Sequence, residues 1–364
     1  MSLPSDLLLL LAILALVAFG VLLLASASSV LGIDLSGDPY TFAKHQIFYG
    51  VIPGVIALFV MMHIPYRILR KIVIPFLLFV IVLLILVFIP PFQTASSGAA
   101  RWVNVGPLSI QPSELAKLAL VLYLAALLSS RDVRGGHIRE TLFPFVTVVS
   151  ILAFLLIAQP NLGTLSLIAA TAMCMYAAAG ARLPHLAGMV TVAGVLFLVL
   201  IRTAPYRLAR LITFLRPETD PKGIGYQVQQ ALIAIGSGGM WGFGLGRSRQ
   251  KFRYLPEPAG DAIFAIAAEE MGFIRIVLFL LLYLFIILRG YRIAQACPDP
   301  FGRLVAVGIT SWFLVQVFVH IGANAGIVPL TGIPLPFVSY GGSALVVALA
   351  GAGILLNISK YSQE

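Results

Sequence analysis

The sequence predicts an all-α polytopic membrane protein with about ten transmembrane helices and one large extracytoplasmic loop between the seventh and eighth. Of the 364 residues, 60% are hydrophobic and only 10% are charged, and the mean hydropathy of +1.01 lies outside the range of soluble globular domains. Several runs approach the ~20 apolar residues that a helix needs to cross the hydrocarbon core. These runs are continuously apolar rather than alternating, which favours helices over a barrel.

Ten segments meet the length and charge criteria for a membrane span. The chain shows no residue-level internal repeat and no low-complexity tract, so one domain over residues 1–364 is the simplest account. The predicted spans cover residues 7–25, 46–62, 72–89, 114–128, 142–158, 164–180, 185–201, 262–288, 304–322 and 343–358.

The orientation follows from Lys and Arg in the short loops, which accumulate on the cytoplasmic side. Basic residues follow the second, fourth, sixth and eighth spans, whereas the opposite short loops carry only Lys44 and Arg101. Both termini are therefore expected in the cytoplasm, and the polar segment 202–261 is expected outside. That segment holds nine of the 24 Lys and Arg residues, but long loops translocate largely regardless of charge.

The formal net charge of +10 is largely this topology signal, so we do not expect nucleic-acid binding. The basic residues expected outside the membrane are available to bind an anionic membrane lipid headgroup or a pyrophosphate. The two cysteines, Cys174 and Cys297, predict neither a structural disulfide nor a metal-binding cluster.

The first polar cluster within the apolar chain runs from Gly98 into the fourth span. Glu114 and Lys117 stand three residues apart there, so they share one helix face and can pair. Two interpretations stay open: an interfacial salt bridge with Glu114 complementing the helix N-terminus, or a pair that lines a polar cavity.

Asp261 lies directly before the eighth span, where aspartate is a favoured N-cap, and the sequence favours this capping role. A catalytic carboxylate could also cap, so the two roles are compatible. Glu269 and Glu270 lie further along the same helix, and we expect them to find internal partners, with Arg275 five or six residues away.

The third cluster, from Asn324 into the last span, carries no charge until Lys360. Pro329, Pro334 and Pro336 cannot sit in one regular helix, and Gly341 with Gly342 allows tight turns. We expect a re-entrant or broken segment, which is tolerated at membrane depth where it is buried in protein or lines a cavity. Transporters also use such segments.

Four segments together resemble the SEDS family, which contains FtsW, RodA and SpoVE, and they occur in the family's order over nearly the whole chain. They read GAARWVNVGPLSIQPSELAKL, GYQVQQALIAIGSGGMWGFGLGRSRQK, YLPEPAGDAIFAIAAEEMGF and PLTGIPLPFVSYGGSALV. The resemblance, slightly closer to the FtsW and SpoVE branch, implies a ten-helix fold in the bacterial cytoplasmic membrane. It also implies a peptidoglycan glycosyltransferase that polymerises lipid II at the outer face, with a class B penicillin-binding protein as partner.

By this resemblance Asp261 matches the family's essential aspartate and Glu114 with Lys117 its paired residues on the fourth helix, so these three are the candidate catalytic residues. Asp261 is suited to take a proton from the attacking sugar hydroxyl. Arg101, Arg210 and Lys117 could stabilise the departing diphosphate. The full set of candidate substrate-binding residues is Arg101, Arg210, Gln111, Lys251, Glu257, Ser339, Gly341 and Gly342.

The chain departs from the family pattern beside the aspartate. Ala259 and Gly260 stand where a His-Thr or similar polar pair is common, Ala262 replaces an aromatic residue, and Asn161 replaces a common aspartate. No titrating role is therefore transferred to Asn161. No cofactor is required by a motif, although carboxylates and phosphates together could hold Mg²⁺ or Mn²⁺. Alternative functions are a flippase or transporter for a lipid-linked precursor and a noncatalytic membrane scaffold of the division or elongation complex.

Overall fold

The computed structural model describes residues 6–90, 93–96, 99–105, 108–130, 138–202, 205–216, 220 and 223–361 of the chain. Within these ranges, nine helical segments are long and apolar enough to cross a membrane. A further apolar helix, α8, has 17 residues and corresponds to the predicted span 164–180. Each of the ten predicted spans thus coincides with a helical segment, which confirms the fold class.

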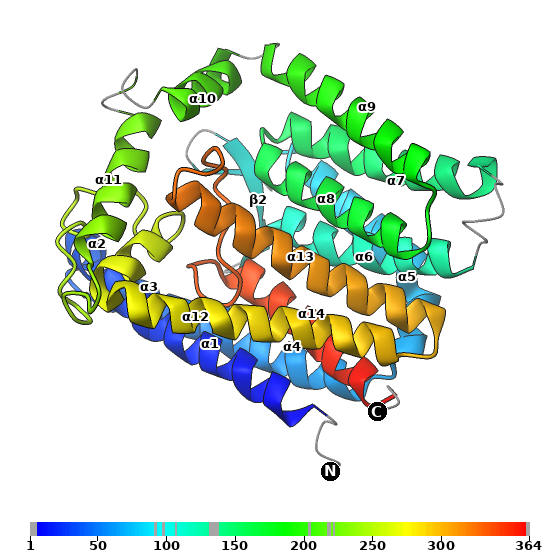
Figure 1. Ribbon diagram of the computed structural model, residues 1–364, viewed down its shortest axis with the longest axis horizontal. Coiled ribbons are helices and arrows are strands. Elements are labelled where there is room, and N and C mark those ends of the chain that lie inside the picture. Colours follow the sequence, from blue (N-terminus) through cyan, green and yellow to red (C-terminus); the bar gives the residue numbers. More distant parts are fainter. Residues whose placement is uncertain are drawn as a thin grey trace.

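The helices lie side by side in one bundle (Figure 1). The first span is α1 (Leu7–Ala27), and the second is formed by α3 (Thr41–Gln46), the π-helical turn η1 (Ile47–Val51) and α4 (Ile52–His63). The remaining long helices are α5 (Tyr66–Leu86), α6 (Pro112–Ser129), α7 (Ile138–Ala158), α8 (Leu162–Ala178), α9 (Leu183–Arg202), α12 (Ile263–Ala296), α13 (Pro300–Asn324) and α14 (Gly342–Ser359).

Side-chain caps define where several of these helices begin. The carboxylate of Asp6 accepts from the Leu9 amide at 3.0 Å and starts α1, while Asp299 accepts from Gly302 at 3.1 Å and starts α13. Asn161 caps α8 by accepting from the Thr164 amide at 3.2 Å. This position, which the sequence already excludes as a titrating group, therefore has a structural role.

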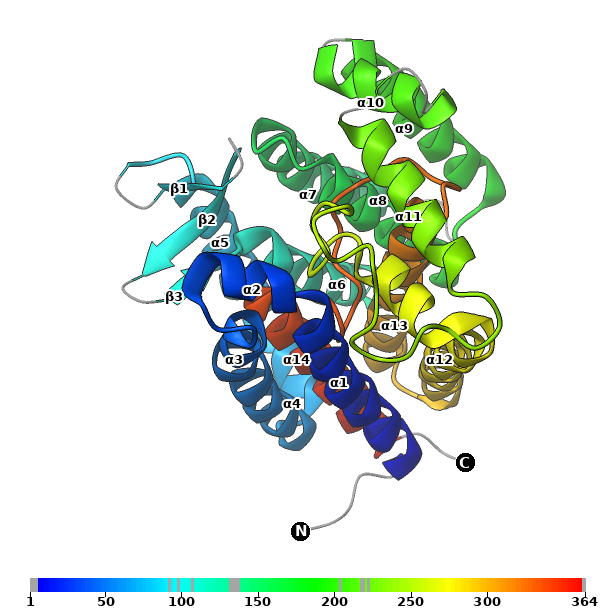
Figure 2. The ribbon, with the colours of Figure 1, turned by 90° about the vertical axis from the view of Figure 1, so that its left-hand side faces the viewer.

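Shorter helices and a small sheet lie at one end of the bundle. The helix α2 (Ser29–Ser36) follows α1, and the segment between α9 and α12 contains α10 (Pro205–Leu215) and α11 (Ile224–Ser237). A three-stranded antiparallel sheet lies between α5 and α6 and has the order β1 (Gln93–Ser96), β2 (Ala99–Val105), β3 (Leu108–Ile110). The sequence did not predict this sheet. Figure 2 shows the sheet at the left edge of this end of the bundle.

The two ends of the bundle are distinguished by polar pairs between α1 and α12. Asp6, just before α1, pairs with Arg289 near the end of α12, whereas Ser26, near the end of α1, contacts Glu270 near the start of α12. The two helices are therefore antiparallel, and residue 261 lies at the end opposite the described N-terminal residues. The C-terminal end of α14 lies at the same end as the start of α1 (Figure 1).

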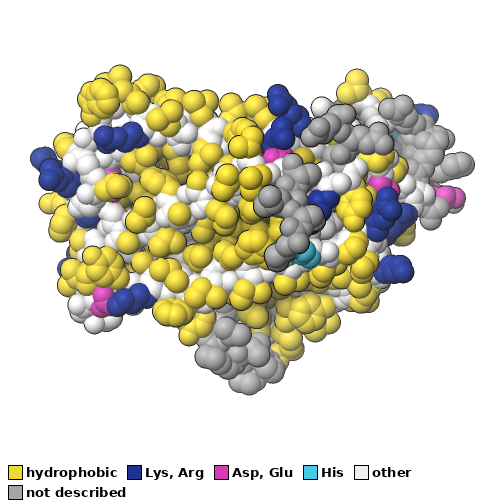
Figure 3. Space-filling view, turned by 90° about the horizontal axis from the view of Figure 1, so that it is seen from below, with side chains coloured by type: hydrophobic (Ala, Val, Ile, Leu, Met, Phe, Trp, Pro, Cys, Tyr) yellow, Lys and Arg dark blue, Asp and Glu magenta, His cyan; other side chains and the backbone are white. Residues whose placement is uncertain are grey.

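The outer surface has the polarity of a protein embedded in lipid. Hydrophobic side chains cover the middle of the face in Figure 3, and most Lys and Arg side chains lie toward its two ends. Inside, small residues bring helices close together. A Cβ added to Gly353 of α14 would collide with the backbone carbonyl of Leu58 in α4. Close backbone approach of this kind is typical of packing between membrane helices.

Candidate functional site

Asp261 ends a tight turn at the start of α12, and its carboxylate does not cap that helix. The N-cap position is Ala262, with no side-chain hydrogen bond, so the capping prediction is wrong. The reason is the turn itself, in which the amides of Gly260 and Ala262 both donate to the Glu257 carbonyl, at 3.2 and 3.1 Å. This backbone path directs the Asp261 side chain toward Gly332, where an added Cβ would lie 3.4 Å from Asp261 Oδ2.

Three consecutive carbonyl groups of this turn are held by residues from the end of the chain. The Tyr340 amide donates to Ala259 at 3.0 Å, and the Ser339 hydroxyl donates to Gly260 at 3.0 Å. The amide group of Asn324 donates to the Asp261 carbonyl at 2.8 Å. Because all three bonds are to the backbone, they fix the turn and leave the Asp261 carboxylate available for chemistry.

The surroundings of Asp261 raise the pKa of its carboxyl group. The pKa of Asp261 is raised to about 6, chiefly by burial and next by the charge of Glu257, while the charges of Arg210 and Arg101 oppose the increase. The carboxylate is therefore largely ionised at neutral pH and has a pKa close to the range that suits a general base.

The segment between α13 and α14 is irregular and buried, which confirms the predicted broken segment. It runs through the middle of the bundle end that faces the viewer in Figure 2. Ile333, Leu335 and Val338 are buried there. Gln46 of α3 secures both sides of the last turn, because its Nε2 donates to the Ser339 carbonyl at 3.3 Å and its Oε1 accepts from the Gly341 amide at 3.0 Å.

Glu114 and Lys117 form the predicted pair, with 2.6 Å between Lys117 Nζ and Glu114 Oε2 and with both side chains only 3% exposed. Lys117 also donates to Gln316 Oε1 at 3.2 Å and lies 5.0 Å from the centre of the Trp312 ring. Among the described residues, the pair therefore contacts other buried side chains of the bundle and makes no direct contact with Asp261.

The other predicted substrate-binding residues fall into two groups. Near Asp261, Glu257 forms the turn, Arg210 is an exposed residue of α10, and Arg101 of β2 donates to the carbonyls of Gln159 and Pro160 at 3.2 and 2.6 Å. Further positions serve the backbone framework: the Gln111 amide donates to Ser343 Oγ at 3.2 Å, and Gly342 packs against the Tyr49 backbone.

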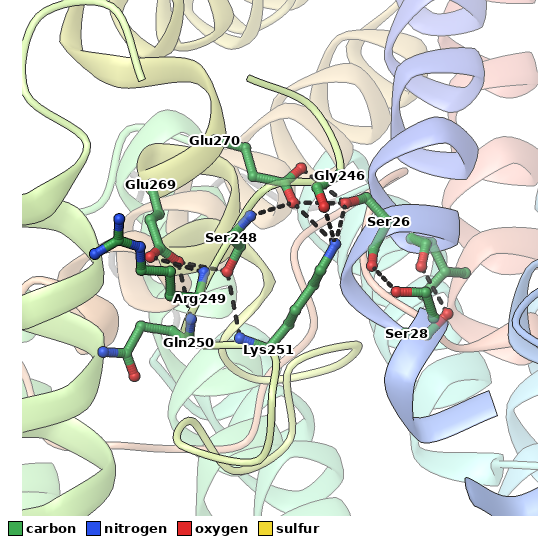
Figure 4. A network of polar contacts seen from close by, with 11 residues as sticks. Ser26, Ser28, Gly246, Ser248, Arg249, Gln250, Lys251, Glu269 and Glu270 are labelled. Carbon is green, nitrogen blue, oxygen red and sulfur yellow. Dashed lines mark hydrogen bonds and ion pairs between the residues drawn. The ribbon is translucent and has the colours of Figure 1, made fainter. Parts of the chain in front are cut away.

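Lys251 lies apart from these residues, in a buried network drawn in Figure 4. Its ammonium group donates to the Gly246 carbonyl at 2.7 Å and pairs with Glu270 at 3.5 Å. Glu269 accepts from the amides of Arg249 and Gln250 at 3.0 and 3.3 Å and from the Ser248 hydroxyl. Both glutamates therefore have internal partners as expected.

The partners of the two glutamates come from the loop before α12 and, for Glu270, also from Ser26 of α1, rather than from Arg275. The guanidinium group of Arg275 instead donates to the Trp241 carbonyl at 2.9 Å. Together with Lys251, the glutamates and Arg275 fasten residues 241–251 against the side of α12. This fastening is structural, and it places the loop that leads into the Asp261 turn.

Sequence reasoning missed the polar residues of α13 that organise the site. Gln316, His320 and Asn324 are spaced four residues apart and are all buried, so they form one polar stripe on an apolar helix. Gln316 donates to the Pro334 carbonyl at 2.7 Å, and His320 Nδ1 lies 2.7 Å from the Ile333 carbonyl. The regular spacing was the available signal, because buried amide and imidazole groups on one helix face require partners.

The described residues contain no group of three or more His, Cys, Asp or Glu side chains placed to hold a metal ion. Asp261 and Glu257 are nevertheless near enough to influence each other electrostatically. Binding of Mg²⁺ or Mn²⁺ with help from substrate phosphates stays a prediction.

Known proteins resemble this chain over almost its full length. It is 43% identical over 363 residues to stage V sporulation protein E from Bacillus subtilis, covering 98% of each chain. It is 39% identical over 354 residues to a "Probable peptidoglycan glycosyltransferase FtsW" from Geobacter metallireducens, covering 97% of this chain and 94% of the relative.

Two solved structures share the fold. The first is described as "Structural coordination of polymerization and crosslinking by a peptidoglycan synthase complex", with a TM-score of 0.80, 29% identity and coverage of 97% and 96% of the two chains. The second is the rod shape determining protein RodA of Thermus thermophilus, with a TM-score of 0.70, 28% identity and coverage of 98% and 97%. The family model described as "Cell cycle protein" matches residues 6–364, and the chain therefore belongs to the FtsW, RodA and SpoVE family.

Proposed function

We propose that this chain is a peptidoglycan glycosyltransferase that polymerises lipid II into glycan strands. The observation that carries the proposal is the carboxylate of Asp261, held at one end of a membrane helix bundle with a pKa of about 6 and with Arg101 and Arg210 close enough to act on it. The names of the FtsW relatives support this assignment.

Glycan polymerisation joins the 4-hydroxyl of one saccharide to the anomeric carbon of another. The carboxylate of Asp261 takes the proton of the attacking hydroxyl as the new glycosidic bond forms, and the bond to the lipid diphosphate breaks. General base catalysis of this kind typically contributes about 10² to 10⁴ in rate. Arg210 and Arg101 stabilise the negative charge on the leaving diphosphate.

The resemblance places the buried pair of Glu114 and Lys117 among the candidate catalytic residues, and its contacts in the structure support a role in positioning. Its contacts to Gln316 connect it to the segment that holds the Asp261 turn. We assign it to positioning of that segment, and we assign Lys251 to anchoring of the preceding loop. Substrate contacts then belong to Arg101, Arg210 and Glu257, which lie at the Asp261 end of the bundle.

The proposal includes a location and a partner. The basic short loops favour cytoplasmic termini, so Asp261 faces the outer side of the bacterial cytoplasmic membrane. Lipid II carries its sugars there when a cell wall is built. The resemblance to a chain of a complex that coordinates polymerization and crosslinking supports a crosslinking partner, a class B penicillin-binding protein.

The test is polymerisation of lipid II by the purified chain together with its partner. Asp261→Ala should abolish glycan formation while the protein still folds and still binds the partner. Asp38→Ala is the matched control, because Asp38 is an exposed carboxylate paired with Lys44 and should leave polymerisation at the wild-type level. Full activity of Asp261→Ala would refute the assignment.

The same preparation separates the alternatives. A flippase would move labelled precursor across liposome membranes without forming glycosidic bonds, and its transport would be the measured activity. A noncatalytic scaffold would be insensitive to Asp261→Ala, whereas substitutions on its lipid-facing helices would break the complex.

A further inference from the structure

A cavity of about 910 Å³ lies at the end of the bundle opposite Asp261. Its walls come from the last turns of α6, α8 and α12 and from the first three turns of α13. These helix ends lie together toward the right of Figure 1, on the side that carries the described chain ends. The cavity is thus separate from the candidate catalytic site and shares no residue with it.

The extent of the cavity matches one leaflet of a membrane. Its lining includes both Pro300 and Ser311 of α13, and eleven helical steps correspond to roughly 16 Å along the axis. The hydrocarbon core of a bilayer is about 30 Å thick. The cavity therefore reaches about half-way into the bundle from one membrane surface.

The lining changes from charged to apolar along this depth. Arg303 and Gln295 stand on the outermost turns of α13 and α12, and Arg303 is exposed and forms no ion pair with a carboxylate of any described residue. Leu128, Leu304 and Val307 provide apolar walls. A small-residue wall, Ala177 and Ala178, leaves room beside them. The deepest polar contact is satisfied internally, because Tyr291 and Ser311 hydroxyls lie 2.9 Å apart.

We propose that this cavity binds one anionic phospholipid of the adjacent leaflet. The phosphate of the lipid pairs with Arg303, whose planar guanidinium group binds phosphate through two parallel hydrogen bonds. The Gln295 side chain provides a further donor at the headgroup level. One acyl chain lies along the alanine wall and the leucine and valine side chains. The charged group at the surface matches a lipid phosphate, and the apolar lining below it matches an acyl chain. This combination favours a phospholipid over a water-soluble anion.

Native mass spectrometry of the full-length chain in detergent, titrated with phosphatidylglycerol, tests the proposal. Arg303→Gln should weaken binding of one lipid by about ten- to a hundredfold, since a charge-assisted pair is lost. Ala178→Trp should also remove that lipid, because Ala178 is exposed to the cavity and the larger ring fills it. The two variants attack the headgroup site and the chain site separately, so a folding failure of one leaves the other decisive.

Matched controls are available at exposed positions that do not line the cavity. Arg292→Gln removes an exposed arginine three residues from Gln295 that does not line the cavity, and Ala193→Trp adds the same ring to an exposed position of α9. Both should bind phosphatidylglycerol as the wild type does. Wild-type affinity for phosphatidylglycerol in both Arg303→Gln and Ala178→Trp would overturn the site. Equal affinity for zwitterionic phosphatidylcholine, or tighter binding of a polyprenyl phosphate, would overturn the assignment to an anionic phospholipid.

Discussion

The Lys117 ammonium group donates to Gln316 Oε1 across 3.2 Å, deep in the bundle between α6 and α13. Gln316 in turn contacts the irregular segment before α14, because its Nε2 donates to the Pro334 carbonyl at 2.7 Å. Pro334 lies in the same irregular segment as Ser339 and Tyr340, which hold the turn before Asp261. A residue of α6 can thereby influence the candidate base without touching it.

Gln316→Leu should destabilise the protein and reduce polymerisation. The substitution leaves the Pro334 carbonyl and the Trp312 indole N–H without their buried partner. Unpaired buried polar groups cost about 1 to 3 kcal/mol each, so for the two groups we expect a loss of about 2 to 6 kcal/mol in the free energy of unfolding. Thermal unfolding in detergent provides the measurement. Gln229→Leu, at an exposed position of α11, is the control, and equal melting of the two variants would contradict the role of Gln316.

Removal of one partner of the buried ion pair should be more harmful than removal of both. Glu114→Leu leaves the Lys117 ammonium group buried without its carboxylate, which typically costs about 3 to 5 kcal/mol. The double variant Glu114→Leu with Lys117→Met should recover part of that loss, because no charge stays buried. A double-mutant cycle on unfolding free energies measures the difference. Strict additivity of the two single losses would show that the pair does not act as a unit.

The rate of polymerisation should fall as the pH decreases through about 6. The proposed base must be ionised, and burial raises the pKa of Asp261 to about 6, so protonation sets in well above the ordinary range of an aspartate. Arg210 opposes this increase, and Arg210→Gln should therefore move the acid limb of the pH profile to higher pH. The pH profile of kcat/KM for lipid II provides the test, because it reports the pKa of the free enzyme. An acid limb near pH 4 in the wild type would be incompatible with this environment.

Gly272→Ala should disrupt the packing of the loop on α12. Gly272 has φ +75°, in the left-handed region, and an added Cβ would collide with the backbone of Trp241 and Gly242. Strain and overpacking together should cost more than about 3 kcal/mol in unfolding free energy. Gly194→Ala in α9 is the control, because a Cβ there would meet no described atom within 4 Å. Comparable melting of both variants would show that the loop is not held at Gly272.

Most of the helical architecture could be predicted because membrane spans are local features. A run of apolar residues of sufficient length becomes a helix whatever surrounds it, since lipid offers the backbone no other partners. The pairing of Glu114 with Lys117 and the break around Pro334 follow from spacing and proline chemistry in the same way. The small sheet between α5 and α6 was missed, because its short strands carry little periodic signal.

The membrane class, the approximate spans, the ion pair on one helix face and the position of the polar segment before α12 could all be derived from the sequence. The direction of the Asp261 side chain depends on folding, because Glu257, Asn324 and Ser339 fix that turn and two of them are more than 60 residues away in the chain. Folding also makes Lys251 an anchor of Glu270 rather than an open cation. Local propensity specifies which segments are helical, but the protonation and direction of a partly buried carboxylate such as Asp261 depend on dipoles and charges that folding brings together.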